Sequence, residues 1–282
     1  MELLTIYTEE ELGKIQVLET DALKIIIEIC EKLEIEYFLI GGTALGAIRH
    51  NGFIPWDDDI DVGMTRSNYE RFLKDAPQYL PDGYFLQTPY EGTSCPYFYS
   101  KLRIDNTKFV EYCNHRVKMH HGVYVDIFPF DEVPDDENLN REQFNRVQKL
   151  IRLFTLRQSP DVSMEPSSFK ERMKAQVRRM AHCFMMLYPY KRILHQLEAE
   201  FTRYNGSGQK AYACLNFPKI YTEYVLKSDL YPLKKHKFGE VEAFIPNNYD
   251  VYLRTHYGDY MKLPPEEQRF GHKPYIVVLD KE

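Results

Sequence analysis

Residues 41–64 of the chain read GGTALGAIRHNGFIPWDDDIDVGM. The glycine pair at the start of this stretch follows a short apolar run, Tyr37 to Ile40. We therefore expect a buried strand that passes through a glycine turn into a helix over residues 44–49. Backbone amides at such a turn, and at a helix N-terminus, can hold phosphate oxygens. The sequence thus predicts a phosphate-binding turn formed by Gly41, Gly42 and Thr43.

The second half of the stretch alternates between acidic and apolar residues. Side chains of a strand point to opposite faces in turn, so Asp57, Asp59 and Asp61 are expected on one face and Ile60 and Val62 on the other. Carboxylates this close repel one another unless protons or a cation offset their charge. Because no His or Cys is interleaved, Mg²⁺ or Mn²⁺ is favoured over zinc. The apolar neighbours argue against a fully solvated acidic turn.

A third carboxylate is expected from a later strand. Residues 122–128, GVYVDIF, alternate in the same way and should end at Pro129, with Asp126 as the candidate. Two aspartates two positions apart, a preceding glycine turn and a third aspartate are typical of metal-dependent transferases that use nucleotides. We expect catalytic roles for Asp59, Asp61 and Asp126, and metal contacts from these three and Asp57. The alternative for Asp126 is a strand-end residue that caps a loop.

The rest of the chain separates into a mixed first half and a helical second half. Capping and periodicity predict helices at 8–34 and 66–76, and strands at 84–87, 97–104 and 107–112. Residues 139–204 have a helical pattern with breaks at Ser159-Pro160 and Tyr188-Pro189. This order predicts an α+β core with a mainly helical addition. We divide the chain into a catalytic core (1–135), a basic helical region (136–237) and a C-terminal segment (238–282) that packs back on the active site.

Charge is distributed unevenly. The formal net charge is −6, yet residues 141–192 hold twelve Lys or Arg and four acids. This basic segment, with Phe184 to Leu187 nearby, suggests peripheral contact with an anionic membrane; a solvated helix face is the alternative. The isoelectric point of about 5.9 gives no support to nucleic-acid binding.

The cysteines and the N-terminus indicate the compartment. Five cysteines without a Cys-x-x-Cys pair argue against a disulfide framework or a thiolate zinc site. The N-terminal residues show no secretory leader, and no apolar run reaches the roughly 20 residues of a membrane span. We expect a cytoplasmic protein that works at the inner face of the membrane.

Residues 41–64 resemble the signature of the LicD family, and so do residues 101–103, 124–131 and 260–269. The resemblance implies a polymerase β-like nucleotidyltransferase core, a mixed sheet with flanking helices. It also implies transfer of a phosphorylated alcohol to a cell-surface glycan or its lipid-linked precursor, typically phosphocholine from CDP-choline, with CDP-ribitol as another donor. Asp59 and Asp61 match the metal-binding pair and Gly41 to Thr43 the phosphate turn. The match does not decide between Asp57 and Asp58.

The implied reaction is an in-line displacement at the donor's β-phosphorus, in which a sugar hydroxyl attacks and CMP leaves. Asp126 is expected either to accept the hydroxyl proton or to hold a second metal ion. Four further residues are candidates for substrate contacts. Arg49, Lys101 and Arg103 could bind phosphate groups, with ordinary salt bridges as the alternative. His272 could contact phosphate or acceptor, with a structural hydrogen bond as the alternative.

Trp56 is the one tryptophan, and it could enclose a quaternary ammonium together with Tyr97, Tyr99 or Tyr124. Core packing or stacking on cytosine is the alternative.

Two other classes of function are alternatives. Nucleotide-sugar glycosyltransferases also hold a metal with Asp-x-Asp, but usually after a nucleotide-binding half of the fold, whereas one helix and one strand precede Gly41 here. A membrane-surface binding module without catalysis could be built on residues 141–192.

Overall fold

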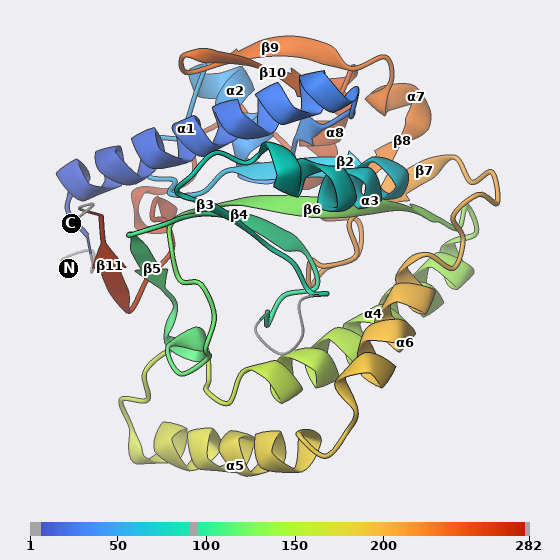
Figure 1. Ribbon diagram of the computed structural model, residues 1–282. Coiled ribbons are helices and arrows are strands. Elements are labelled where there is room, and N and C mark those ends of the chain that lie inside the picture. Colours follow the sequence, from blue (N-terminus) through green and yellow to red (C-terminus); the bar gives the residue numbers. More distant parts are fainter. Residues whose placement is uncertain (1–6, 91–94, 280–282) are drawn as a thin grey trace.

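The computed structural model describes residues 7–90 and 95–279 and shows an α+β protein whose helices flank a curled, mixed sheet (Figure 1). The path through the sheet is β1 (Phe38–Leu39), β2 (Asp61–Thr65), β6 (Tyr124–Val133), β4 (Ser100–Ile104) and β3 (Tyr84–Gln87). β2 and β6 run parallel, and the other neighbours are antiparallel. β7 (Ala211–Ala213) pairs with the far end of β6, and β8 (Tyr224–Leu226) pairs with β7.

β6 is the central strand, and every one of its residues is buried. The prediction that it ends at Pro129 is wrong, because it continues to Val133. The Asp126 amide donates to the Ile60 carbonyl on the β2 side. Backbone nitrogens point to the two edges of a strand in turn, so the nitrogen of Pro129 faces the other edge. On that edge β4 pairs up to Ile127 and β7 pairs from Asp131. Pro129 falls in the gap, where a missing N–H removes no ladder bond.

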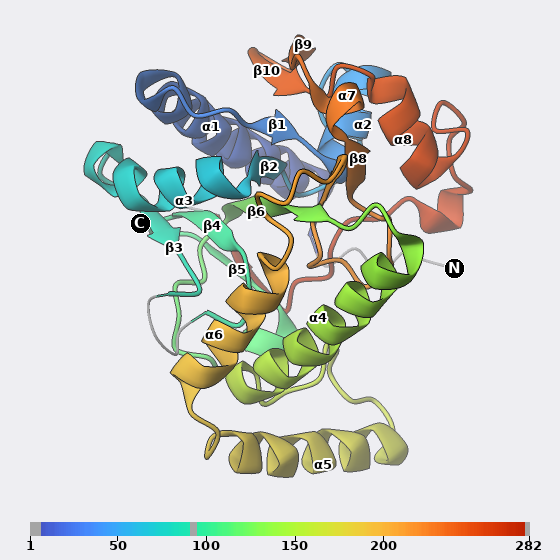
Figure 2. The ribbon, with the colours of Figure 1, turned by 90° about the vertical axis from the view of Figure 1, so that its right-hand side faces the viewer.

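The helices lie in two groups on opposite faces of the sheet, as both views show (Figure 1, Figure 2). On one side are α1 (Glu9–Leu33), α2 (Gly41–His50), α3 (Arg66–Asp75), α7 (Lys227–Leu230) and α8 (Tyr249–Tyr257). On the other are α4 (Glu137–Gln158), α5 (Phe169–Met185) and α6 (Tyr190–Phe201). The predicted capping box of the first helix, Thr8 with Glu11, is confirmed. The predicted breaks at residues 159–160 and 188–189 also separate α4, α5 and α6 as expected.

Two apolar clusters hold these layers together. The larger one joins α1, the sheet and the C-terminal elements, and the smaller one joins α4 and α6 through residues such as Phe144, Phe154, Leu197 and Phe201. Residues 136–237 are not wholly helical, because β7 and β8 join the main sheet there. The division of the chain at residues 135 and 237 stays a prediction.

The C-terminal segment returns to the core. β9 (Lys234–Phe238) and β10 (Val241–Ile245) form a hairpin beside α2 and β1, and β11 (Ile276–Val278) pairs with β5 (Lys108–Val110). Short 3-10 turns at Ala76–Tyr79, Tyr112–Asn114 and Glu266–Gln268 complete the connections. Within the described residues, no helix combines the length and the apolar character that crossing a bilayer requires.

Candidate active site

The acidic run before β2 alternates in burial as the sequence predicts. Asp58, Ile60 and Val62 are buried, whereas Asp57, Asp59 and Asp61 are partly accessible. The regular strand is shorter than expected, since it begins only at Asp61. The carboxylates of residues 57, 59 and 61 therefore belong to the open side of an extended segment, and Asp58 belongs to its inner side.

Asp58 accepts hydrogen bonds from residues near both ends of the described chain. Its Oδ2 accepts a hydrogen bond from the Tyr7 hydroxyl at 2.6 Å, and its Oδ1 accepts from the backbone N and from Nδ1 of His272 at 2.9 and 3.0 Å. Burial opposes ionisation of Asp58, but the bonds from His272 and Tyr7 outweigh it and hold its pKa below the usual value. The bond to Asp58 in turn raises the pKa of His272 to about 10. Asp58 is thus an anchor with its oxygens engaged, and His272 is its partner.

The three accessible carboxylates are crowded against one another. Asp57 and Asp59 share a hydrogen bond, and burial followed by the charges of Asp59 and Asp58 raises the pKa of Asp57 to about 8. Burial also raises the pKa of Asp59, although nearby His272 opposes the shift. The pKa of Asp61 lies well above its usual value through burial and the charges of Asp59 and Asp126.

Asp126 joins this group from the neighbouring strand. Its register partner in parallel strand β2 is Asp61. Lys101 Nζ lies 2.6 Å from Asp126 Oδ1 and 3.4 Å from the centre of the Tyr124 ring. Burial raises the pKa of Asp126 to about 6, against the opposing effect of Lys101. Lys101, predicted as a phosphate ligand, is therefore the buried partner of Asp126.

The glycine turn borders the same carboxylates. α2 begins at Gly41 rather than at residue 44, with Gly41 at a φ of 53°. A Cβ on Gly42 would lie 2.8 Å from Asp57 Oδ2, and one on Gly41 would lie 3.4 Å from Asp61 Oδ2. The hydroxyl of Thr43 accepts the Asp61 amide at 2.9 Å. The start of α2 and the carboxylates thus form one surface, which only glycine leaves open at positions 41 and 42.

Two acidic residues of this region were not found from the sequence. Glu223, just before β8, is 2% exposed, and Tyr252 of α8 donates its hydroxyl proton to it. The Gly41 amide donates to the Tyr252 oxygen at 3.0 Å. Burial raises the pKa of Glu223 to about 8. No local pattern marks Glu223, because its neighbours come from distant segments.

Glu19 of α1 is the second. It is 1% exposed, its Oε2 has no hydrogen-bond partner among the described residues, and burial followed by the charge of Asp59 raises its pKa well above the usual value. A signal for it existed, since Glu19 interrupts the apolar stripe that Ile15 and Ile26 define on α1.

A hard divalent cation fits these residues. Six carboxylates act on one another here, and the described cations at the site are Lys101 on Asp126 and His272, 3.8 Å from Asp59. Carboxylates with raised pKa values, three of them buried and one of these with an unpartnered oxygen among the described residues, are the donor set that Mg²⁺ or Mn²⁺ would satisfy. The six are Glu19, Asp57, Asp59, Asp61, Asp126 and Glu223.

A tighter group of possible metal ligands is Asp58, Asp59 and His272, whose donor atoms lie within 4.8 Å of one another. We favour the carboxylate set over this group. The Nδ1 of His272 already donates to Asp58, and its raised pKa keeps the ring protonated, so that nitrogen has no lone pair for a metal.

The remaining predicted residues lie in different surroundings. Arg49 donates to the Tyr260 carbonyl at 2.7 Å and to His50, and lines a groove of about 490 Å³ together with Trp56 and the segment at Pro264. The Trp56 ring faces Arg269 at 5.5 Å. This groove lies between α2 and the C-terminal segment.

The predicted aromatic enclosure of Trp56 with the tyrosines stays a prediction, since the ring contact that the structure gives for Trp56 is with His50. Tyr97, Tyr99 and Tyr124 surround the Lys101 ammonium, at 4.5, 5.3 and 3.4 Å from their ring centres. Arg103 is 1% exposed and donates to Gln87 Oε1 and to the Gly122 carbonyl at 2.7 and 2.8 Å. In this structure its guanidinium stabilises the sheet.

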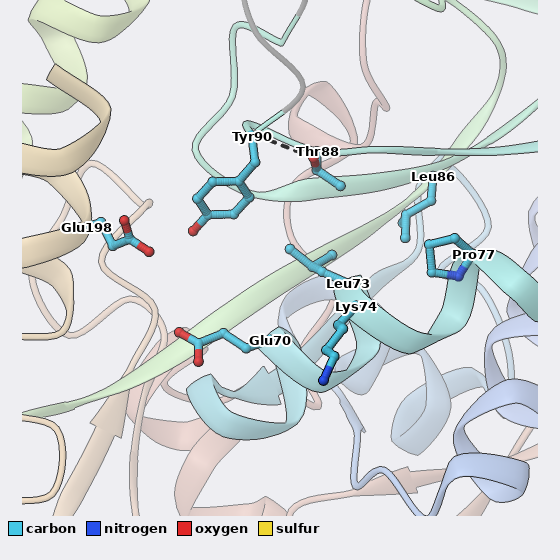
Figure 3. Close-up of a pocket in the computed structure, with 8 residues that line it drawn as sticks. All are labelled: Glu70, Leu73, Lys74, Pro77, Leu86, Thr88, Tyr90 and Glu198. Carbon is cyan, nitrogen blue, oxygen red and sulfur yellow. Dashed lines mark hydrogen bonds between the residues drawn. The ribbon is translucent and has the colours of Figure 1, made fainter. Parts of the chain in front are cut away.

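A second cavity, of about 350 Å³, lies between α3, β3 and α6 (Figure 3). Tyr90 and the carboxylates of Glu70 and Glu198 line it beside apolar side chains. It holds none of the residues that the sequence predicts for the site, within the described part of the chain.

Comparison with known proteins finds relatives in one family of transferases. Residues 34–151 match the family model LicD, described as LicD/FKTN/FKRP, nucleotidyltransferase domain. The chain is 29% identical over 261 residues to the lipopolysaccharide cholinephosphotransferase LicD of Haemophilus influenzae, which covers 86% of this chain and 89% of that protein. It is 44% identical over 39 residues to the human ribitol 5-phosphate transferase FKRP, covering 14% of this chain and 8% of that one. The chain therefore carries a LicD-family domain at residues 34–151.

Proposed function

We propose that this protein is a transferase that moves a phosphorylated alcohol from a CDP-alcohol to a hydroxyl of a cell-surface glycan or its lipid-linked precursor, with release of CMP. The names of its relatives, a cholinephosphotransferase and a ribitol 5-phosphate transferase, support phosphoryl-alcohol transfer in general. We take phosphocholine from CDP-choline as the first choice, because the cholinephosphotransferase match spans most of both chains. CDP-ribitol is the second choice.

The observation that carries this proposal is the contact between the glycine turn and the carboxylates. The backbone of Gly41 and Gly42 lies against Asp57 and Asp61 so closely that a side chain at position 42 would collide with Asp57. Amides bind phosphate oxygens and carboxylates bind divalent cations, so the two halves of a site for a metal-bound diphosphate are adjacent. The strand pair β2 and β6 supports a polymerase β-like core, since Asp61 and Asp126 lie on these neighbouring strands of a mixed sheet.

In the proposed mechanism the amides at the start of α2 hold the donor's diphosphate. Asp59, Asp61 and Asp126, with Asp57, would hold Mg²⁺ or Mn²⁺, which when bound offsets charge on the diphosphate. Tyr252 and Glu223 fix the Gly41 amide and thereby the position of the turn. The acceptor hydroxyl attacks the β-phosphorus in line with the departing CMP, and a carboxylate oxygen of Asp126 that binds no metal accepts its proton. The groove beside Arg49 and Trp56 offers room for the donor's alcohol or the acceptor.

A panel of donors tests the proposal. The purified protein is incubated with CDP-choline, CDP-ribitol or UDP-glucose, each with an oligosaccharide or lipid-linked acceptor and either Mg²⁺ or EDTA. We expect CMP release and an acceptor mass raised by one phosphoryl-alcohol unit, only with Mg²⁺. Release of UDP alone would identify a glycosyltransferase instead, and turnover in EDTA would contradict the metal site.

A further inference from the structure

Helix α5 is attached to the protein through its polar face. Arg178 donates to the Asp161 carbonyl at 2.6 Å, Arg179 donates to Asp161 Oδ1 at 2.8 Å, and the His182 ring bonds the Leu156 carbonyl at 2.9 Å. The one fully buried residue of the helix is Ala175. Amphipathic helices of globular proteins normally pack with the apolar face inward, so α5 has the reverse orientation.

The apolar face of α5 is turned toward solvent. Its residues recur at intervals of three or four and fall within about 80° of arc at 3.6 residues per turn. Leu187 follows one turn later, and all six side chains are 51–82% exposed. These residues are Phe169, Met173, Val177, Met180, Phe184 and Leu187.

Both views place α5 at the edge of the molecule, with α4 and α6 between it and the sheet (Figure 1, Figure 2). An outermost single helix offers a long row of apolar side chains without a groove. A flat, extended surface can contact the whole row at once, whereas a folded partner would need a matching cleft.

Basic residues surround the row. Residues 166–195 contain seven Lys or Arg and a single acid, Glu171; two of the seven, Arg178 and Arg179, are bound to Asp161, and the other five are free of it. Glu171 accepts hydrogen bonds from Ser167 and Ser168 in a capping box, so its charge is engaged at the helix start. Lys170 and Lys174 border the row and are exposed, and Lys191 and Arg192 follow it. An apolar row with flanking cations is complementary to an anionic lipid surface, where each nearby cation contributes about 1 kcal/mol.

We propose that α5 lies in the interface of an anionic lipid bilayer, with Phe169, Phe184 and Leu187 among the acyl chains and the flanking lysines at the headgroups. The inference is independent of the chemistry proposed above. It assigns a membrane-binding face to a helix outside the residue range that matches the family model, 34–151.

The first experiment measures flotation of the full chain with vesicles made of equal parts phosphatidylglycerol and phosphatidylcholine, or of phosphatidylcholine alone. No donor or acceptor is present, so a failure here is separable from a failure of the transferase proposal. We expect binding to the anionic vesicles that weakens at high salt, and little binding to the neutral ones. Equal binding to both kinds of vesicle would overturn the proposal.

Matched variants then test the face itself. Val177→Gln with Met180→Gln should weaken binding about tenfold, because two exposed apolar side chains no longer enter the bilayer. The control, Val17→Gln with Met261→Gln, changes the same residue types at similar exposure on other elements and should bind like the unmodified protein.

Lys170→Glu with Lys174→Glu should weaken binding to anionic vesicles more than Lys235→Glu with Lys237→Glu, which changes the net charge equally. Unchanged flotation of the Val177→Gln, Met180→Gln variant overturns the assignment.

A fluorophore locates the contact. Cys183, an exposed thiol on α5, takes an environment-sensitive maleimide dye, and peptide mass mapping confirms the labelled position. We expect a blue shift of emission on addition of anionic vesicles. A blue shift that instead grows with protein concentration, together with a doubled mass by light scattering, would show that a second copy of the chain covers α5 and would overturn the membrane assignment.

Discussion

Asp61 and Asp126 are register partners on the parallel strands β2 and β6, and Asp126 Oδ1 lies 2.6 Å from Lys101 Nζ. The strand pair therefore carries two carboxylates, and the buried lysine contacts one of them. The charges of Asp57 and Asp59 act on Asp61 as well. Burial and this mutual repulsion raise the pKa values of the group. The protein must take up either protons or a cation to fold around them.

This competition predicts how pH changes the effect of Mg²⁺ on stability. An acid whose pKa is raised in the folded state retains a proton that the unfolded chain has lost, so stability falls as pH rises from about 4 toward the folded-state pKa. The folded pKa values are about 6 for Asp126 and about 8 for Asp57. Mg²⁺ binds the deprotonated carboxylates and should stabilise the protein more at pH 8 than at pH 6.

At a hundred times its dissociation constant, Mg²⁺ would add about 2.7 kcal/mol, or roughly 5 °C in Tm. Thermal unfolding with Mg²⁺ and with EDTA gives the Mg²⁺-induced shift in Tm at each pH. Groups far from the site titrate equally in both solutions, so their effect on Tm cancels in this shift. The same Mg²⁺ shift at pH 6 and pH 8 would contradict the assignment of the cation to these carboxylates.

The double variant Asp59→Asn, Asp61→Asn should separate function from folding. It removes two of the crowded charges, so its Tm in EDTA should equal or exceed that of the unmodified protein, while turnover falls at least about a thousandfold. The stabilisation by Mg²⁺ should disappear with the activity. A control, Asp75→Asn with Asp82→Asn, removes the same charge elsewhere and should keep both. Retained turnover in the first variant would place the metal at other residues.

Local patterns predicted the parts of this site that lie close together in sequence. The alternation of residues 57–62 correctly placed Asp57, Asp59 and Asp61 opposite Ile60 and Val62, because side-chain direction along an extended chain needs no tertiary information. The helix breaks at Pro160 and Pro189 are likewise local consequences of proline geometry.

Tertiary partners decided the rest. The surroundings of Arg103, held by Gln87 and the Gly122 carbonyl inside the sheet, follow from strand pairing that its own neighbours do not encode. Pro129 did not end β6, because the gap between β4 and β7 that accommodates it depends on residues 211–213, which are distant in sequence. Glu223 was missed for the same reason, since its partner is Tyr252 of α8.

The pair Lys101 and Asp126 should be strongly coupled in stability. Lys101→Met leaves a buried carboxylate without its cation, and Asp126→Asn leaves a buried ammonium, so each change should cost about 3 kcal/mol in EDTA. The double variant should cost less than the sum by at least about 1 kcal/mol, yet remain inactive, because Asp126 is a proposed metal ligand. Urea unfolding of the four proteins measures the coupling. Additive costs would show that the 2.6 Å contact contributes nothing to stability.

Tyr252 connects the start of α2 to Glu223, and its removal should affect both stability and catalysis. Tyr252→Phe takes away the acceptor of the Gly41 amide and the donor to a buried carboxyl, so it should cost about 1–3 kcal/mol. Turnover should fall further than the loss of folded protein explains, since the phosphate turn is no longer fixed. Tyr249→Phe, on the same helix, is the matched control, because its hydroxyl makes no hydrogen bond within the described residues. If both variants keep the turnover of the unmodified protein per folded molecule, Tyr252 only supports the fold.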